Sequence, residues 1–315
     1  MPSREIKRVG IVGTGVIGAS WAAYFLARGF DVVATDPAAG AEARLRDSIA
    51  VAWPALERMG LAAGARADRL RFAPDAESCA AESDFVQENG PEREEIKRNT
   101  FRRLDAAAGP DVILASSTSG YGPSVFQGAC TRYPERVVVG HPFNPPHLIP
   151  LVEVVGGDAT SEGAIEGAMT FYAAIGKRPI RIRKELRGHV ANRLQAALWR
   201  EAYHLVEVGA VTVAEVDAAI AHGPGLRWAL LGPCVLSHLS GGPGGMRHLL
   251  EHLGPLTEAL WADLGSPELS PALKETLIAG VEHELSGVDR AAMVTDRDRL
   301  LVDLLAAKAA SPNLP

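Results

Sequence analysis

A histidine and a glutamate twelve residues apart are the side chains in this sequence best suited to proton transfer. His141 follows one apolar run, and Glu153 interrupts the next, LVEVV. A carboxylate inside a buried strand needs a partner. An imidazole bonded to it would keep one tautomer and leave its second nitrogen free as a base. On residue type and spacing alone, a capped core histidine and a glutamate facing water explain the pattern equally well.

A glycine motif near the start of the chain is suited to binding a dinucleotide. It lies between an apolar run and a helical pattern over residues 19–28, and a second apolar run ends in Asp36. Such glycines allow a tight turn, a close pyrophosphate and close helix packing, while the acid accepts hydrogen bonds from ribose hydroxyls. We therefore expect cofactor contacts from Gly13, Gly15, Val16, Ile17, Gly18 and Asp36. Because a carboxylate at Asp36 would repel a 2′-phosphate, NAD is favoured over NADP.

Two further polar residues are candidates for binding a substrate. Ser119 belongs to the stretch SSTSG, which follows the apolar run VILA, although a hydroxyl-rich turn is by itself the better explanation of that stretch. Asn192 lies among apolar residues of a helical pattern, where its amide must find a hydrogen bond. A satisfied core asparagine would explain Asn192 equally well.

The elements that must position these residues follow from the apolar pattern. Apolar runs alternate with helical stretches as far as residue 187, which is typical of a βαβ series. Strands are expected at residues 9–13, 31–35, 84–88, 112–116, 136–141, 151–155 and 178–183, with a helix at 164–175. Helical spacing without a strand signal continues at residues 190–208, 213–220, 245–254 and 296–309. The predicted fold is α/β: a Rossmann-type doubly wound, mostly parallel sheet (1–187, NAD-binding) followed by an all-helical C-terminal domain (188–315).

Composition narrows the class of protein. The 315 residues carry a net charge of −6 without a dense basic run, which argues against nucleic acid or an anionic membrane as partners. Cys79, Cys130 and Cys234 are too few and too far apart for a disulfide framework or a zinc site. The few cysteines favour a cytoplasmic protein without a metal. Because the sequence has no apolar leader and no run of about 20 apolar residues, we expect it neither to be exported nor to span a membrane.

The motifs GTGVIG, SSTSG, GHPFNPP and HVANRLQ resemble, in order and spacing, those of the 3-hydroxyacyl-CoA dehydrogenase superfamily over nearly the whole chain. The resemblance implies that His141 and Glu153 form the catalytic pair and that Ser119 and Asn192 bind the substrate. It also implies cofactor contacts from Glu92, Lys97, Ser119 and Asn144. The helical domain is expected to form a homodimer.

Within that superfamily the sequence is most similar to members that oxidise small hydroxy acids, first the gulonate-oxidising branch that includes lambda-crystallin, then the carnitine-oxidising branch. The similarity rests on STSG at 117–120, HPFNP at 141–145 and GLRWA at 225–229. Arg227 offers a planar, bidentate partner for a substrate carboxylate, although it could instead cap a helix end. Tyr121-Gly122 and the stretch GGPGG at 241–245 depart from the pattern and leave the substrate open.

The expected activity is therefore NAD-dependent oxidation of the 3-hydroxyl of a small hydroxy acid to the 3-oxo acid. A 3-hydroxyacyl-CoA dehydrogenase or polyketide-chain ketoreductase is the first alternative, and it would need a basic surface for CoA phosphates, such as Arg66, Arg69 and Arg71. A structural, crystallin-like protein that binds NAD without turnover is the second. The complete set of Ser119, His141, Glu153 and Asn192 counts against it.

Overall fold

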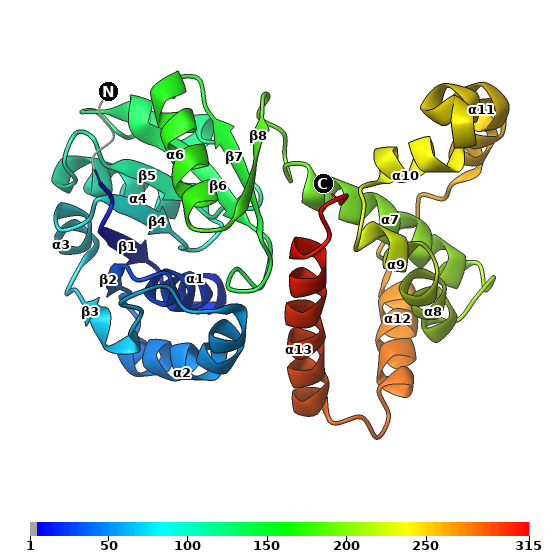
Figure 1. The fold of residues 1–315 in the computed structure, drawn as a ribbon, viewed down its shortest axis with the longest axis horizontal. Coiled ribbons are helices and arrows are strands. Elements are labelled where there is room, and N and C mark those ends of the chain that lie inside the picture. Colours follow the sequence, from blue (N-terminus) through cyan, green and yellow to red (C-terminus); the bar gives the residue numbers. More distant parts are fainter. Residues whose placement is uncertain (1–4, 315) are drawn as a thin grey trace. The chain divides into compact units, whose positions relative to one another are not determined.

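The structure, a computed structural model, describes residues 5–314. The chain forms two compact units, the first ending at Asn192 and the second beginning at Arg193. The division lies five residues beyond the boundary expected at 187/188. The predicted α/β fold followed by an all-helical part is confirmed (Figure 1).

An eight-stranded sheet forms the centre of unit 1, in the order β3-β2-β1-β4-β5-β6-β7-β8. The strands are β1 (Arg8–Val12), β2 (Asp31–Thr35), β3 (Leu70–Phe72), β4 (Phe85–Glu88), β5 (Ile113–Ser116), β6 (Val137–Pro142), β7 (Leu151–Gly156) and β8 (Arg178–Ile182). All neighbours pair in parallel except β6 and β7, which are antiparallel. Seven strands match expected ones. The short edge strand β3 was not predicted.

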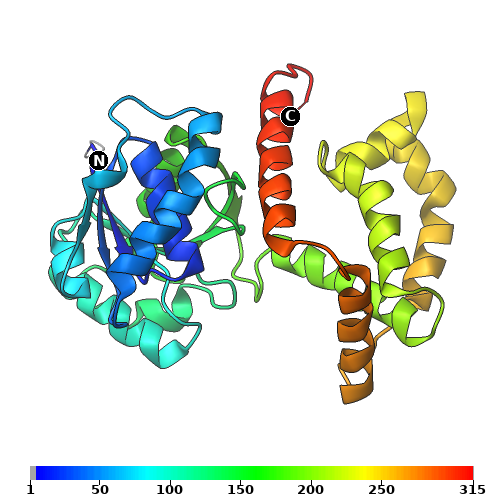
Figure 2. The same cartoon turned by 90° about the horizontal axis from the view of Figure 1, so that it is seen from below.

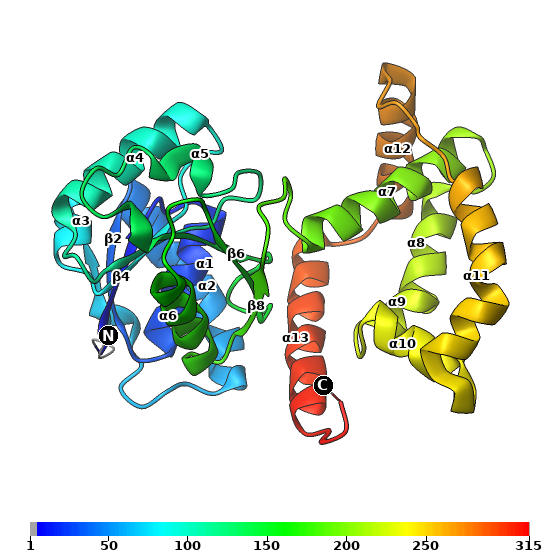
Figure 3. The ribbon, with the colours of Figure 1, turned by 90° about the horizontal axis from the view of Figure 1, so that it is seen from above.

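Helices cover both faces of this sheet, as its nearly continuous apolar strands require. They are α1 (Val16–Ala27), α2 (Ala41–Met59), α3 (Ala76–Ala81), α4 (Glu94–Ala107), α5 (Ser124–Gln127) and α6 (Glu162–Ala174). One core cluster joins the sheet to α1, α2 and α6 around Trp21 and Phe171, and another joins the opposite face to α3, α4 and α5 around Phe101 and Phe126 (Figure 3).

The strand order determines where chemistry can take place. It reverses between β1 and β4, and ligands of doubly wound sheets bind at such a switch point, beyond the carboxyl ends of the strands. The glycine motif follows β1, Asp36 follows β2, Ser119 lies just beyond β5, and His141 is near the end of β6. One edge of the sheet therefore gathers residues that are far apart in the sequence.

Unit 2 consists of helices without a sheet. They are α7 (Ala191–Glu207, which begins in the last residues of unit 1), α8 (Val213–His222), α9 (Pro224–Trp228), α10 (Pro233–Ser240), α11 (Gly245–Asp263), α12 (Pro271–Glu284) and α13 (Arg290–Ala309). Figure 2 shows these helices spread out, and the apolar side chains that are buried here are few: Val206, Val213, Leu273 and Val302. Within residues 5–314, no helix has the length and apolar character needed to cross a membrane.

Candidate active site

The glycine loop between β1 and α1 has the shape that a pyrophosphate requires. Gly13 has a φ of 89°, which favours glycine, and a Cβ at Gly18 would overlap the Gly13 carbonyl oxygen. At Gly15 a Cβ would meet nothing within 4 Å. Since no side chain caps α1, the N–H groups of its first turn remain available to an anion. The exposed Val16 and its neighbour Ile17 lie in that turn. The loop therefore fits a dinucleotide.

Asp36, which directly follows β2, is hydrogen-bonded to the glycine loop. Its Oδ2 accepts hydrogen bonds from the N–H (2.8 Å) and hydroxyl (3.3 Å) of Thr14, and its Oδ1 accepts one from the N–H of Ala38 at 2.9 Å. A carboxylate has about four acceptor positions. Three of these positions are used here, and the two bonds from Thr14 of the glycine loop fix the orientation of the carboxylate that would face a ribose.

The His141 and Glu153 side chains are joined by a hydrogen bond. The antiparallel register of β6 and β7 sets the two residues directly opposite each other, so their side chains share one face of the sheet. His141 Nδ1 lies 2.8 Å from Glu153 Oε2, and both side chains are buried. A carboxylate only accepts, so Nδ1 carries the proton and Nε2 is the nitrogen left for a substrate.

The second oxygen of Glu153 is also satisfied. Its Oε1 accepts hydrogen bonds from the N–H groups of Val190 and Ala191, both at 2.9 Å, where α7 begins. Burial acts to raise the pKa of Glu153, but the bond from His141 and the two backbone N–H groups outweigh it, so the pKa lies below its usual range. Glu153 is therefore an anion at neutral pH and is able to stabilise an imidazolium at His141.

Ser119 lies in a loop that Glu92 holds. Glu92 Oε1 accepts from the Ser119 N–H at 2.6 Å and from its hydroxyl at 3.3 Å, while Oε2 accepts from the Thr118 hydroxyl at 2.7 Å. A cavity of about 720 Å³ opens beside this loop, and Tyr121 and Glu185 also line it. The Tyr121-Gly122 pair that departs from the family pattern thus shapes the space next to Ser119.

Lys97 lies beneath the sheet edge rather than on the surface. It is 1% exposed, and its ammonium lies 3.1 Å from Glu88 Oε2, 3.5 Å from the Ser116 hydroxyl and 3.5 Å from the Gly90 carbonyl. Glu88 in turn accepts from the Ser116 hydroxyl and the Gly90 N–H, both at 2.6 Å. This network fixes the loops after β4 and β5. A direct contact between Lys97 and the cofactor stays a prediction.

The remaining sequence-predicted residues make no side-chain hydrogen bonds with the described part of the chain. Asn144 is exposed in the loop after β6, and Asn192 is half-buried in the first turn of α7. The flanking Leu194 is 62% exposed and does not provide the buried apolar surroundings expected for Asn192. Arg227 is exposed on α9 in unit 2, and no ion pair is found for it within residues 5–314.

Several residues near the site were missed by reasoning from sequence. Gln87 donates to the Ser117 hydroxyl at 2.7 Å and to the Gly140 carbonyl at 3.1 Å, which joins β4 to the loop after β5 and to β6. Glu88 and His189 are the others. Polar residues at the end of an apolar strand were the available signal for Gln87 and Glu88. Nothing comparable marks His189.

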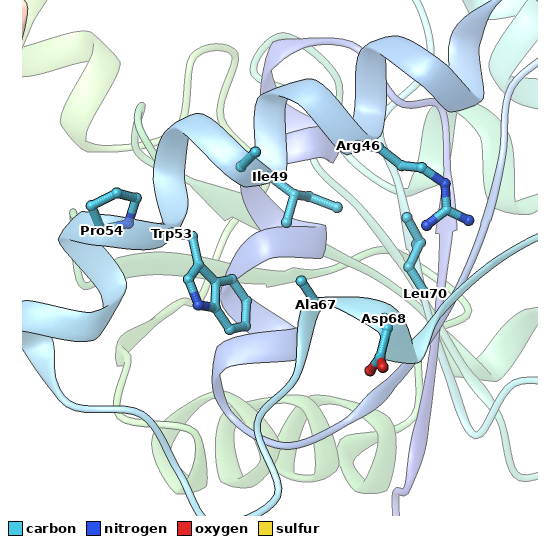
Figure 4. A pocket seen from close by; sticks show the side chains of 8 residues that line it. Arg46, Ile49, Trp53, Pro54, Ala67, Asp68 and Leu70 are labelled. Atoms are coloured by element: carbon cyan, nitrogen blue, oxygen red, sulfur yellow. The ribbon is translucent and has the colours of Figure 1, made fainter.

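A second hollow, of about 490 Å³, lies away from this edge (Figure 4). It is lined mainly by apolar side chains of α2, including Ile49 and Trp53, and by the segment that leads into β3. That segment precedes β3, whereas ligands of such sheets bind beyond the carboxyl ends of strands. The hollow is therefore separate from the candidate active site.

A glycine loop and acid suited to NAD, together with a buried imidazole–carboxylate pair at the same sheet edge, define an NAD-dependent dehydrogenase. Family models agree with this class. The model of the 3-hydroxyacyl-CoA dehydrogenase NAD-binding domain matches residues 8–186, and that of its C-terminal domain matches residues 188–263. The chain belongs to the 3-hydroxyacyl-CoA dehydrogenase family.

Individual relatives refine the comparison. The chain is 52% identical over 308 residues to L-carnitine dehydrogenase of Streptomyces griseus, covering 98% of this chain and 92% of the relative. It is 50% identical over 305 residues to L-carnitine dehydrogenase of Bacillus cereus, covering 97% and 93%. These findings support the carnitine-oxidising branch rather than the gulonate-oxidising branch with lambda-crystallin, which the motifs ranked first.

A solved protein structure has a similar fold over nearly the whole chain. It is that of 5-formyl-3-hydroxy-2-methylpyridine 4-carboxylic acid 5-dehydrogenase, an NAD⁺-dependent dismutase. The TM-score is 0.83 at 30% identity, and the match covers 97% of this chain and 99% of the other. The similarity in fold thus covers nearly all of both chains.

We expect the unaltered protein to use NAD far better than NADP, because Asp36 would face the 2′-phosphate. Asp36→Asn keeps one acceptor oxygen for Thr14, loses the acceptor for the Ala38 N–H and removes the charge. It should lower the ratio of kcat/KM for NAD to kcat/KM for NADP about ten-fold or more. Initial rates with both cofactors measure the ratio, and equal turnover of the two by the unaltered protein would contradict the assignment.

Proposed function

We propose that this protein oxidises the 3-hydroxyl of L-carnitine to the 3-oxo acid with NAD as hydride acceptor. The near full-length identity of about half to two L-carnitine dehydrogenases carries the choice of substrate. The His141–Glu153 pair supports the reaction type. The test is to incubate the purified chain with L-carnitine and NAD, follow NADH by absorbance, and identify the 3-oxo product by mass spectrometry.

In the proposed reaction His141 is the general base. Nε2 takes the proton of the C3 hydroxyl as the C–O bond becomes a carbonyl. NAD⁺, when it is bound, would accept the hydride from C3. The imidazolium that forms is stabilised by Glu153, whose charge is held by Nδ1–H and two backbone N–H groups. In the reverse direction His141 returns the proton as the acid.

Ser119 and Asn192 are proposed to align the substrate oxygen, and Arg227 to bind the substrate carboxylate. The loop of Ser119 is fixed by Glu92, which supports a positioning role. The side chains of Asn192 and Arg227 have no hydrogen-bond partner among the described residues, so both are available to a ligand. A guanidinium matches a carboxylate with two parallel bonds.

The acyl-CoA alternative loses its residue-level support. Each of the three arginines that could have bound CoA phosphates is already ion-paired, Arg66 with Asp68, Arg69 with Asp31 and Arg71 with Glu82. These arginines therefore already have acidic partners, which disfavours them as an unopposed basic surface for CoA phosphates. A cytoplasmic location is also proposed, in agreement with three free cysteines.

The helical unit is proposed to form a homodimer with the helical unit of a second copy. Large apolar side chains are exposed along its helices, among them Trp199, Leu256, Leu260 and Trp261 at 47%, 60%, 55% and 67%. Exposed apolar surface on this scale marks an interaction site. Trp199 lies on α7 and the other three side chains lie on α11. A symmetric dimer would cover such a surface with its own copy.

Light scattering after size exclusion should give twice the chain mass of 33.3 kDa. Trp261→Glu, which places a charge in the exposed apolar surface, should shift the population toward monomer. Arg247→Glu, an exposed charge change on the same helix, is the control and should leave the mass unchanged. A monomeric mass for the unaltered chain would contradict the dimer.

A further inference from the structure

His189 lies between the two parts of the site that must act together. It precedes α7, is 0% exposed, and its ring centroid lies 5.0 Å from that of His141. The next two residues, Val190 and Ala191, donate their N–H groups to Glu153. On its other side, His189 Nε2 lies 3.0 Å from the Thr118 carbonyl oxygen, in the Ser119 loop.

The peptide between Thr118 and Ser119 is held at both ends. Its carbonyl oxygen accepts from His189, and its N–H donates to Glu92 at 2.6 Å. Rotation of this peptide would move Ser119 relative to His141. The two bonds together therefore fix the direction from which the Ser119 hydroxyl approaches the site.

His189 carries two costs that packing alone does not explain. Its φ is 51°, and it is the one non-glycine residue in the described chain with a positive φ, a conformation that side chains rarely adopt. Because the Thr118 carbonyl only accepts, Nε2 holds the proton, and Nδ1 is buried without a hydrogen-bond partner. A phenyl ring would fill similar space without the unpaired nitrogen. The donor at Nε2 is the feature that the histidine has and a phenyl ring lacks.

We infer that His189 is a positioning residue, which sets the Ser119 loop against the His141–Glu153 pair through its bond to the Thr118 carbonyl. The inference rests on the proposed function, since it concerns the alignment of that reaction's groups. Burial is the main reason that the pKa of His189 lies below its usual range, although the bond to Thr118 opposes the shift. A neutral ring there avoids repulsion with the imidazolium that forms at His141.

Two substitutions separate positioning from folding. His189→Phe keeps a ring and removes the donor, whereas His189→Gln supplies an N–H donor at a similar distance along the side chain. We expect kcat/KM for L-carnitine to fall about 10- to 100-fold in His189→Phe, because small misplacements of reacting groups have effects of that size. His189→Gln should recover most of the loss. Thermal stability of His189→Phe should be unchanged or higher, and NADH affinity, measured by fluorescence titration, should stay the same.

A matched control and a pH profile complete the test. Tyr24→Phe removes another buried ring donor to a main-chain carbonyl, that of Ile175 at 2.8 Å, and should leave kcat/KM unchanged. His189 faces His141, Glu153 and Glu92. Because folded His189 takes up a proton less readily than the unfolded chain, it lowers the free energy of unfolding as pH falls below about 6.5. That part of the pH dependence should vanish in His189→Phe.

Near-normal kcat/KM in His189→Phe would overturn the inference, as would parallel losses of activity and melting temperature in both His189 variants. Failure of the unaltered protein to form NADH from L-carnitine would instead contradict the proposed function. The two failures are therefore distinguishable in one set of assays.

Discussion

His141→Ala should lower kcat about 10²- to 10⁴-fold, because the alcohol proton would lose its base. NADH affinity should change little, because His141 lies on β6. In the sheet, β4 and β5 separate this strand from β1, which leads into the glycine loop, and from β2, which leads to Asp36. Single-turnover and steady-state rates with saturating NAD measure kcat, and fluorescence titration measures NADH binding. His283→Ala, an exposed histidine on α12, is the control for removing an imidazole and should keep full activity.

Glu153→Gln should reduce kcat less than His141→Ala does. The amide has one acceptor oxygen, which can serve His141 Nδ1–H or the N–H groups of Val190 and Ala191 but not both, and it no longer stabilises the imidazolium by charge. Near-normal turnover in His141→Ala would mean that the proton moves through another group, and the proposed mechanism would be wrong.

Arg227→Met should lower kcat/KM for L-carnitine about 30- to several-thousand-fold, the range expected when a charged partner of a substrate carboxylate is removed. Methionine keeps much of the side-chain stem, so the loss should be specific to the charge. L-carnitine methyl ester, which lacks the carboxylate, should show little difference between the two proteins. Comparing acid and ester in both proteins gives a cycle that isolates the interaction.

The control for that cycle is Arg247→Met, which removes an exposed arginine on α11 and should affect neither substrate. Parallel losses for acid and ester in Arg227→Met would assign Arg227 to folding or assembly. The preference for a free carboxylate would then lose its main residue-level support.

Much of unit 1 follows from local sequence. Gly13 and Gly18 are required by a positive φ and by a close backbone approach, and both constraints act within one strand–loop–helix unit. The twelve-residue spacing of His141 and Glu153 corresponds to two antiparallel strands that place them opposite each other. Apolar runs were sufficient to find seven of the strands. Strand β3 was missed because its three residues include Arg71 and lie at an edge.

Other features depend on segments that meet only in three dimensions. The sequence PEREEIK reads as a solvated helix start, yet Lys97 is buried because α4 packs over the ends of β4 and β5 and Glu88 supplies a charge. The environment of His189 arises where the chain leaves β8 and meets the Ser119 loop. In unit 2 the spacing of apolar residues predicts helices. Many of these apolar side chains are nevertheless exposed in the single chain, so the spacing alone does not show which face of a helix is buried.

A comparison of kcat/KM for NADH formation with L-carnitine, L-gulonate, 3-hydroxybutyrate and 3-hydroxybutyryl-CoA shows which hydroxy acid the site selects. All four carry a 3-hydroxyl, and the three small acids also carry a free carboxylate, which the thioester lacks. We expect the highest kcat/KM for L-carnitine and a much lower value for the CoA thioester. A preference for 3-hydroxybutyryl-CoA, or no NADH formation from any of the four, would contradict it.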